Sequence, residues 1–327
     1  MGGGRISKLK ADPDIEPAFL LILKDHTAGS PQKEEVLWTD LSCTEIRDKL
    51  KDQGLSVGKR IIKKLLHKHN FKKRKIQRRT SIKQVANRNE QFEKITKLKQ
   101  EYTESGNPMI SVDAKKRELI GEFYRAGFVY TKEEIAALDH DFPNLARGVA
   151  IPHGIFDLKK NTAHINIGTS HETSEFACDS LKKWWMEKGC LDYPKATSIL
   201  MLMDGGGSNS SRRHLFKEGL QKLANEIGIE IRIAHYPPYT SKWNPIEHRV
   251  FPHVTRAMQG IILSSHDLAK QLIEKTKTKT GLRVSVSLID KVYELGKKVA
   301  EDFKKNMKIV FDDVLAQWNY RAVPMAS

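Results

Sequence analysis

Three acidic residues lie at the ends of predicted strands or near the start of a predicted helix, where the backbone can hold a side chain rigidly. Asp113 and Asp204 each end an apolar run that predicts a β-strand. Glu247 lies one turn into a helix that begins at Asn244-Pro245, because Asn is a favoured N-cap and Pro is tolerated at the first helical position. Carboxylate oxygens are the ligands that hard cations such as Mg²⁺ prefer. Together the three acids could bind metal ions.

Taken singly, none of these acids is specific. An aspartate after a strand is common in turns, and Asn244 to Glu247 is also the pattern of a capping box, in which the third helical residue bonds back to the N-cap. The glycines that follow Asp204 suggest a nucleotide-binding loop, but they lack both the Gly-Lys-Ser/Thr ending and the GxGxxG spacing. The prediction therefore depends on whether the fold brings the acids together.

The elements predicted between the acids would do so. In order they are a strand ending at Asp113, strands 154–157 and 163–168, helix 174–189, strand 197–203, helix 211–227, strand 229–235 and the helix with Glu247. Strands separated by helices predict an α/β fold with both faces of the sheet covered. This order describes an RNase H-like mixed sheet flanked by helices, in which the first and fourth strands are neighbours. Asp113 and Asp204 would then meet.

The N-terminal third carries charge. The chain has a formal net charge of +16, and no acidic residue occurs between Asp52 and Glu90, which indicates a polyanionic partner. Residues 44–51 predict a helix, Gly54 a turn, and residues 57–69 a basic second helix. This is the helix-turn-helix pattern, whose second helix enters the major groove of DNA.

The basic tail after that helix would lie along DNA phosphates. The residues predicted to contact DNA in this region are Lys59, Arg60, Lys63, Lys64, Lys72, Lys73, Arg74, Lys75, Arg78 and Arg79. A run of charge can also be only a solvated face, but the helix pattern argues against that alternative. Residues 15–23 predict a further helix, which makes the domain all-α. Residues 85–102 predict a connecting helix, and Ser105-Gly-Asn-Pro108 ends it, so the expected domains are 1–105 and 106–327.

Other features exclude several classes of protein. Cys43, Cys178 and Cys190 are widely spaced and odd in number, so they support neither a zinc ribbon nor a disulfide framework. That usage fits a reducing cytosol. No apolar run approaches the roughly 20 residues that span a membrane. The N-terminal residues have no apolar stretch typical of a secretory signal. We therefore expect a cytoplasmic protein with no membrane partner.

Three blocks of the chain resemble a known family. They are Ser111-Val-Asp-Ala-Lys-Lys-Arg-Glu118, Asp204-Gly-Gly-Gly-Ser-Asn209 and Tyr236-Pro-Pro-Tyr-Thr-Ser-Lys-Trp-Asn-Pro-Ile-Glu-His-Arg249. They are similar to blocks of the Rhodopirellula-type DDE transposases of bacterial insertion sequences, which are related to the mariner-like superfamily. The resemblance runs from Gly2 to Tyr320. Ala114 stands where Thr is more usual, and Pro252 should kink the helix that carries Glu247.

The resemblance implies a bacterial, nucleoid-associated enzyme that binds the terminal inverted repeats of its element, as a homodimer on double-stranded DNA. Asp113, Asp204 and Glu247 would be the catalytic triad and would bind two Mg²⁺ or Mn²⁺ ions, with Asp113 bridging both. Water would attack first to free a 3′-OH, which would then attack target DNA. Further phosphate contacts are expected from Lys115, Lys116, Arg212, Lys242 and Arg249.

Two other functions fit the same residues. One is a catalytically silent DNA-binding protein of transposase origin, and the other is a metal-dependent DNA nuclease of RNase H-like fold. A nuclease would hydrolyse DNA without joining a 3′-OH to a target, so a strand-transfer assay separates it from a transposase. Residues 260–327 predict a helix at 266–277, a strand at 282–289 and a helix at 292–307, with no function beyond DNA contact or dimer packing.

Overall fold

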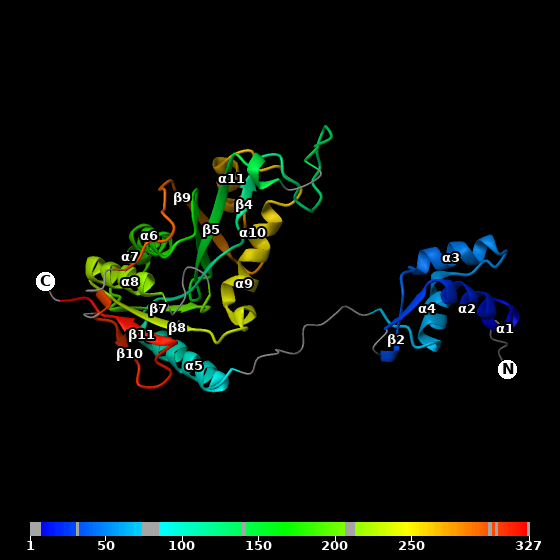
Figure 1. Cartoon of the computed structure of the whole chain (residues 1–327), viewed down its shortest axis with the longest axis horizontal. Coiled ribbons are helices and arrows are strands. Elements are labelled where there is room, and N and C mark those ends of the chain that lie inside the picture. Colours follow the sequence, from blue (N-terminus) through cyan, green and yellow to red (C-terminus); the bar gives the residue numbers. More distant parts are fainter. Residues whose placement is uncertain are drawn as a thin grey trace. The chain divides into compact units, whose positions relative to one another are not determined.

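The computed structural model describes residues 8–30, 33–73, 85–138, 142–206, 213–299, 303–304 and 307–325. The chain divides into two compact units, Met1–Thr80 and Ser81–Ser327 (Figure 1). This boundary lies earlier than the one predicted between residues 105 and 106. The two units are therefore described separately.

Helix α5 (Arg88–Ser105) explains the difference in the boundary. Its buried face, which includes Ile95 and Leu98, packs with Leu200 and Leu202 of the sheet in the second unit. We had predicted a connecting helix because the segment is polar and charged. It connects the units in sequence, but its apolar contacts make it part of the second unit.

The first unit is a small helical bundle with a β-hairpin. Its elements are α1 (Lys8–Ala11), α2 (Ile15–Asp25), β1 (Thr27–Ser30), β2 (Lys33–Thr39), α3 (Cys43–Asp52) and α4 (Lys59–Lys68). The three predicted helices are present, and Gly54 has the positive φ of 83° that its turn requires. Their core includes Phe19, Leu50 and Leu65. The prediction of an all-α domain is wrong, because β1 and β2 pair as antiparallel strands.

The second unit is built on a mixed sheet, as predicted. Its strands are β3 (Met109–Ala114), β4 (Glu118–Ile120), β5 (Gly148–Asp157), β6 (Thr162–Gly168), β7 (Ser198–Met203), β8 (Glu230–His235), β9 (Arg283–Ile289), β10 (Val310–Phe311) and β11 (Asn319–Ala322). The order is β10-β11-β8-β7-β3-β5-β6-β9, with β4 beside β5. Strands β3, β7 and β8 run parallel, whereas β5 is antiparallel to β3. The expected neighbours, the first and fourth predicted strands, are β3 and β7.

Helices cover both faces of this sheet. They are α6 (Ser174–Trp184), continued by a π-helical turn (Trp185–Gly189) and α7 (Cys190–Asp192), then α8 (His214–Ile227), α9 (Pro245–Arg249), α10 (Phe251–Ala257) and α11 (His266–Glu274). Short 3₁₀ turns occupy Pro143–Leu145 and Ser241–Trp243. In β3, Ile110 and Val112 belong to the core under α6 and α8, so the alternate residues face the side of α5 and α9 (Figure 1). None of the described helices is long and apolar enough to cross a membrane.

The C-terminal segment completes the sheet at its two ends. Strand β9 lies parallel to β6, and β11 lies antiparallel to β8. The helix predicted over 292–307 is wrong for residues 292–299, which form no helix. The reason is local, because Gly296 has a positive φ of 77°, and Val292 and Leu295 remain 81% and 68% exposed rather than facing a core.

Candidate functional site

Asp113 and Asp204 occupy equivalent positions, directly after the last paired residues of two neighbouring strands. The last residues paired between β3 and β7 are Val112 and Met203, so Asp113 and Asp204 are the next residues on the two strands. Neighbouring strands lie about 4.8 Å apart. Strand alternation gives Asp113 and Asp204 the same face of the sheet, the one on the side of α9. Both are half-buried at the carboxyl edge of the parallel strands, where ligands bind in open α/β sheets.

Helix α9 delivers Glu247 to this edge, and a glycine lets it approach. Gly154 on β5 lies opposite Asp113. A Cβ atom on Gly154 would come within 2.6 Å of Ile246 Cδ1 and 2.8 Å of Phe251 Cε1, so only glycine allows α9 and α10 this close to the sheet. We had assigned Gly154 only to a strand. A glycine inside a strand is nevertheless a recognisable sign of close packing against another element.

The kink expected from Pro252 is present. Helices α9 and α10 are separate, and the break lies at Val250, whose φ of −122° and ψ of −59° are not helical. Pro252 lies in the first turn of α10, where its missing N–H costs nothing. Glu247 therefore sits on a helix of only five residues, held mainly by what surrounds it.

The three carboxyl groups interact electrostatically. The pKa of Asp113 is raised to about 9, first by burial, then by a hydrogen bond with Glu247 and by repulsion from Asp204 and Glu247. The Ala114 N–H donates to Asp113 Oδ1 at 2.9 Å and opposes this rise. Burial also raises the pKa of Asp204, with a further contribution from Glu247. Burial and the neighbouring acids therefore disfavour the ionised forms of Asp113 and Asp204.

The donor set suits a hard divalent cation. Three carboxylates supply only oxygen ligands, and their mutual repulsion is the kind of charge that a bound cation relieves. The side chains are neighbours without being fully assembled. Among the residues that the structure describes, no group of three or more His, Cys, Asp or Glu side chains is arranged to hold a metal ion.

His235 supports Asp204 from β8. A carbonyl oxygen only accepts hydrogen bonds, so His235 Nδ1 carries the proton and donates to the Asp204 carbonyl at 3.0 Å. The Tyr320 hydroxyl then donates to His235 Nε2, also at 3.0 Å. Burial lowers the pKa of His235 to about 4, which keeps the ring neutral. Both ring nitrogens are occupied, which fits a structural role for His235.

Strand β11 and helix α5 also support the site, through hydrogen bonds that reach the backbone of His235. Gln91 Nε2 donates to the His235 carbonyl at 2.9 Å, and Asn319 Nδ2 donates to Gln91 Oε1 at 2.7 Å. Gln91 and Asn319 are fully buried. Sequence reasoning missed Gln91, Asn319 and Tyr320, because each supports the site across more than 80 positions of the chain.

The Lys and Arg side chains that are predicted to contact DNA differ in how exposed they are. Lys59, Arg60, Lys63, Lys64, Lys72 and Lys73 are exposed in the first unit, and Lys116, Lys242 and Arg249 are exposed in the second. Arg74, Lys75, Arg78, Arg79 and Arg212 lie outside the described residues. Lys115 is less accessible than the exposed residues, because its side chain is only 11% exposed and pairs with Glu118 at 2.5 Å. The Arg249 guanidinium lies 4.8 Å from the centroid of the Phe156 ring.

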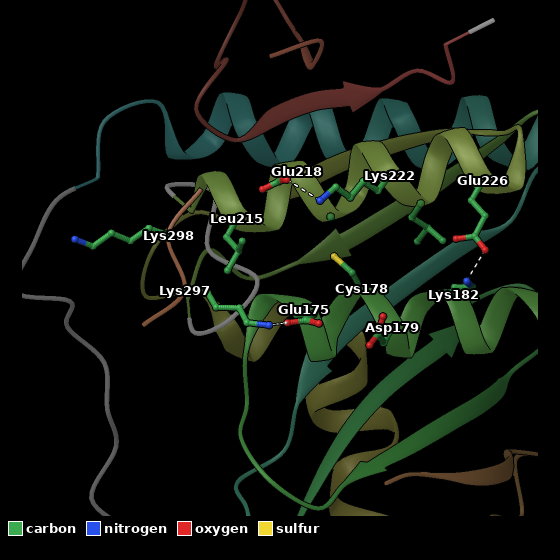
Figure 2. A pocket seen from close by; sticks show the side chains of 12 residues that line it. Glu175, Cys178, Asp179, Lys182, Leu215, Glu218, Lys222, Glu226, Lys297 and Lys298 are labelled. Atoms are coloured by element: carbon green, nitrogen blue, oxygen red, sulfur yellow. Dashed lines mark hydrogen bonds and ion pairs between the residues drawn. The ribbon is translucent and has the colours of Figure 1, made fainter. Parts of the chain in front are cut away.

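A separate pocket of about 480 Å³ lies between α6 and α8 (Figure 2). Its lining does not include the three acids. Ion pairs within the lining join Lys222 to Glu218 at 2.7 Å and Lys297 to Glu175 at 2.9 Å, and Lys182 also pairs with Glu226. These lysines are already neutralised by the pocket's own acids, so we assign the pocket no role in binding DNA.

Comparison with known proteins decides the family. A family model described as the Rhodopirellula transposase DDE domain matches residues 18–324. The chain belongs to this family. The resemblance predicted from three sequence blocks is therefore confirmed over nearly the whole length, and membership assigns the transposase to DNA transposition, a form of DNA recombination.

Other comparisons add less. No curated protein matches the transposase. Two similar solved structures are the Mos1 mariner paired-end complex with Mn, at 13% identity and a TM-score of 0.42, and the Mos1 strand transfer complex, at 11% identity and a TM-score of 0.43. Each match covers 84% of this chain, and 73% and 72% of the respective Mos1 chains. These scores are too low to carry a residue-by-residue argument.

Proposed function

We propose that this transposase cuts and joins DNA at the ends of its element through Asp113, Asp204 and Glu247. The observation that carries the proposal is the meeting of three acids from distant parts of the chain. Asp113 and Asp204 follow paired residues on adjacent strands, and Glu247 is close enough to both to raise their pKa values. Buried, mutually repelling carboxylates are costly for stability, so their presence favours a functional role.

The acids would hold two Mg²⁺ or Mn²⁺ ions. When bound, such ions activate the attacking hydroxyl and stabilise the leaving oxygen of a phosphodiester. In the first step water would break a P–O bond and release a 3′-OH end. In the second step that 3′-OH would attack a phosphodiester of the target DNA, so that a new P–O bond forms and the target's own 3′-oxygen leaves. Asp113, which is repelled by both other acids, would contact both ions, and His235 would hold the Asp204 backbone in place.

The first unit would select the DNA. Helix α4 has exposed Lys59, Arg60, Lys63 and Lys64 on one side and buried Ile62 and Leu65 on the other, which fits a helix that lies in a DNA groove. We propose that it binds the terminal inverted repeats and that two copies act together on paired ends. Replacing Lys63 and Lys64 by Ala should reduce the salt slope of DNA binding by roughly 2. A slope near zero for the unaltered protein would contradict the proposal.

The direct test uses the DNA that flanks the reading frame. A plasmid carrying both flanks is incubated with the purified protein and Mg²⁺ or Mn²⁺, and nicks and joining to a second plasmid are measured. Asp204→Asn should lower both activities roughly 10³-fold, because several kcal/mol of charge stabilisation would be lost. Asp192→Asn, which alters an exposed aspartate paired with Lys160, should leave both unchanged. Undiminished cutting by Asp204→Asn would refute the assigned site.

A second candidate is a DNA-binding protein of transposase origin that does not cut. It is favoured by the lack, among the described residues, of a group of three ligands already arranged for a metal ion. This candidate predicts salt-dependent binding to the flanking DNA with no nicks at any metal concentration. A third outcome, nicks without joining, would indicate a simple nuclease.

A further inference from the structure

Two buried polar side chains join the strand of Asp113 to the helix of Glu247. Ser111 on β3 and Asn244 before α9 are both fully buried. The Ser111 hydroxyl donates to Asn244 Oδ1 at 2.5 Å, and Asn244 Nδ2 donates to the Val112 carbonyl at 3.2 Å. The Ser111 oxygen also accepts from the Ile246 N–H at 3.0 Å. Three hydrogen bonds therefore fasten the start of α9 to β3.

These bonds replace the usual cap of the helix. Asn244 occupies the N-cap position, yet its side chain makes no capping hydrogen bond. The first N–H groups of a helix have no partner within it, and Ile246 supplies one of them. Ser111 accepts this N–H from a different part of the chain. The strand that precedes Asp113 thus caps the helix that carries Glu247.

Each of the two residues is rigidly connected to one acid. Ser111 precedes Asp113 by two positions, so the two side chains share one face of β3. Asn244 precedes Glu247 by one helical turn, and the Glu247 N–H donates to the Asn244 carbonyl at 3.1 Å. The bonds between Ser111 and Asn244 therefore also control how Glu247 lies relative to Asp113.

The side-chain types fit this role. The Asn244 amide both accepts from Ser111 and donates to Val112, which an aspartate could not do while ionised. An aspartate would also add negative charge beside three acids. The five-residue helix α9 cannot hold itself in place, because so short a helix is unstable alone, and Asp113 and Glu247 repel each other when ionised. A fixed attachment to β3 counters both effects.

We propose that Ser111 and Asn244 are positioning residues that hold Asp113 and Glu247 at the separation needed to bind a divalent cation. The inference rests on the proposed function, since it assigns these two acids to the metal site. It adds two residues that touch neither the DNA nor the ions. Their loss should weaken metal binding by roughly 10- to 100-fold, which is the effect typical of removing a residue that holds a metal ligand in place.

The test compares two buried serines. Ser111→Ala removes the attachment, whereas Ser180→Ala removes another fully buried hydroxyl, one that accepts from Asn166 Nδ2 at 2.8 Å and contacts His153 Nδ1 at 2.7 Å. Mn²⁺ binding is measured by calorimetry on the full chain without DNA, and nicking of the flanking DNA is measured against Mg²⁺ concentration. We expect Ser111→Ala to weaken both metal responses about 10-fold or more. Ser180→Ala should keep the affinity of the unaltered protein.

Two further measurements guard against a variant that merely unfolds. Ser111→Thr keeps the hydroxyl and should restore most of the metal affinity. In the unaltered protein, the Ile246 amide should exchange its hydrogen with solvent slowly, because Ser111 accepts it in a buried place. Exchange as fast as that of an open amide would overturn the attachment without any variant.

The failures of the two proposals are distinguishable. If Glu247→Gln abolishes nicking but Ser111→Ala and Ser180→Ala show the same metal affinity, Ser111 is not a positioning residue and the proposed function stands. If Glu247→Gln nicks DNA as the unaltered protein does, the proposed function fails whatever Ser111 does.

Discussion

Two helices of this transposase begin with the same local pattern and use it differently. Helix α3 begins in the segment Ser42-Cys-Thr-Glu45, and α9 begins in the segment Asn244-Pro-Ile-Glu247. At α3 the Ser42 N–H donates to Glu45 Oε2 at 2.6 Å, and the Ser42 hydroxyl accepts from the Glu45 N–H at 3.3 Å. This is a capping box. These hydrogen bonds hold the pKa of Glu45 below its usual value.

At α9 the same residue types face the sheet. Asn244 bonds to Ser111 and Val112 on β3, and Glu247 lies close enough to Asp113 to raise its pKa. We had considered a capping box as the plain alternative for Glu247, and α9 does not have one. The difference lies in the surroundings. Helix α3 begins in an exposed place, where only its own backbone competes for the side chains, whereas α9 begins against a buried strand.

The largest expected effect is a difference in DNA cleavage between variants of Glu247 and variants of Glu45. Glu247→Gln should lower cleavage of the flanking DNA roughly 10³-fold, because a metal-binding carboxylate would be lost. Glu45→Gln, measured at saturating DNA, should keep the rate of the unaltered protein. An equal loss of cleavage rate in both variants would contradict a specific role for Glu247.

The response to acid should also differ between the units. Burial lowers the pKa of His153 in the second unit to about 4, from an ordinary value near 6.5, and burial lowers the pKa of His164 too. The unfolded chain therefore binds more protons between pH 6.5 and 4. Stability that is present above pH 6.5 is lost as the pH falls, by up to about 3 kcal/mol from His153 alone.

The first unit should resist this range of pH. The pKa values of Glu16 and Glu45 lie below 4.5, so protonation of these groups weakens it only at lower pH. Amide hydrogen exchange at pH 7 and pH 5 can follow each unit separately. His153→Gln, which cannot titrate, should flatten the response of the second unit. Equal loss of protection in both units at pH 5 would contradict this prediction.

Stability should also distinguish Asp113 from an ordinary polar residue. In metal-free protein, Asp113→Asn should raise stability by at least about 1 kcal/mol, or roughly 2–4 °C, because burial and two neighbouring acids disfavour its ionised form. The same variant should lose DNA cleavage. Thermal unfolding with a chelator present measures the gain. A lower melting temperature would show that Asp113 is held mainly by favourable contacts.

The smallest effect concerns the capping box itself. Glu45→Ala should destabilise the first unit only slightly, since it removes one of two capping bonds at an exposed helix start. Denaturant unfolding followed by hydrogen exchange in α3 would detect it. Glu247→Ala in metal-free protein should not show this loss, because Glu247 makes no capping bond and its removal relieves repulsion on Asp113.

Prediction succeeded where a local signal was enough. The apolar run that ends at Met203 predicts a strand buried on both faces, and β7 is one. Asn244-Pro245 predict the start of α9, and Pro252 its interruption. The hairpin of β1 and β2 was missed because the sequence Gly29-Ser30-Pro31 is typical of a loop, whereas Gly29 and Ser30 belong to β1. The ion pair of Lys115 with Glu118, three positions later, was not predicted, because the fold and not the local pattern leaves the Lys115 side chain only 11% exposed.

The sequence alone determined the helices and strands of the site, the acids at their ends and the positive charge of α4, because each depends on nearest neighbours in the chain. Only the tertiary structure decided that Ser111 caps α9, that Gly154 admits it and that His235 holds Asp204. The physical reason is that a buried polar group must find a partner, and which partner is within reach depends on the parallel pairing of strands far apart in the chain.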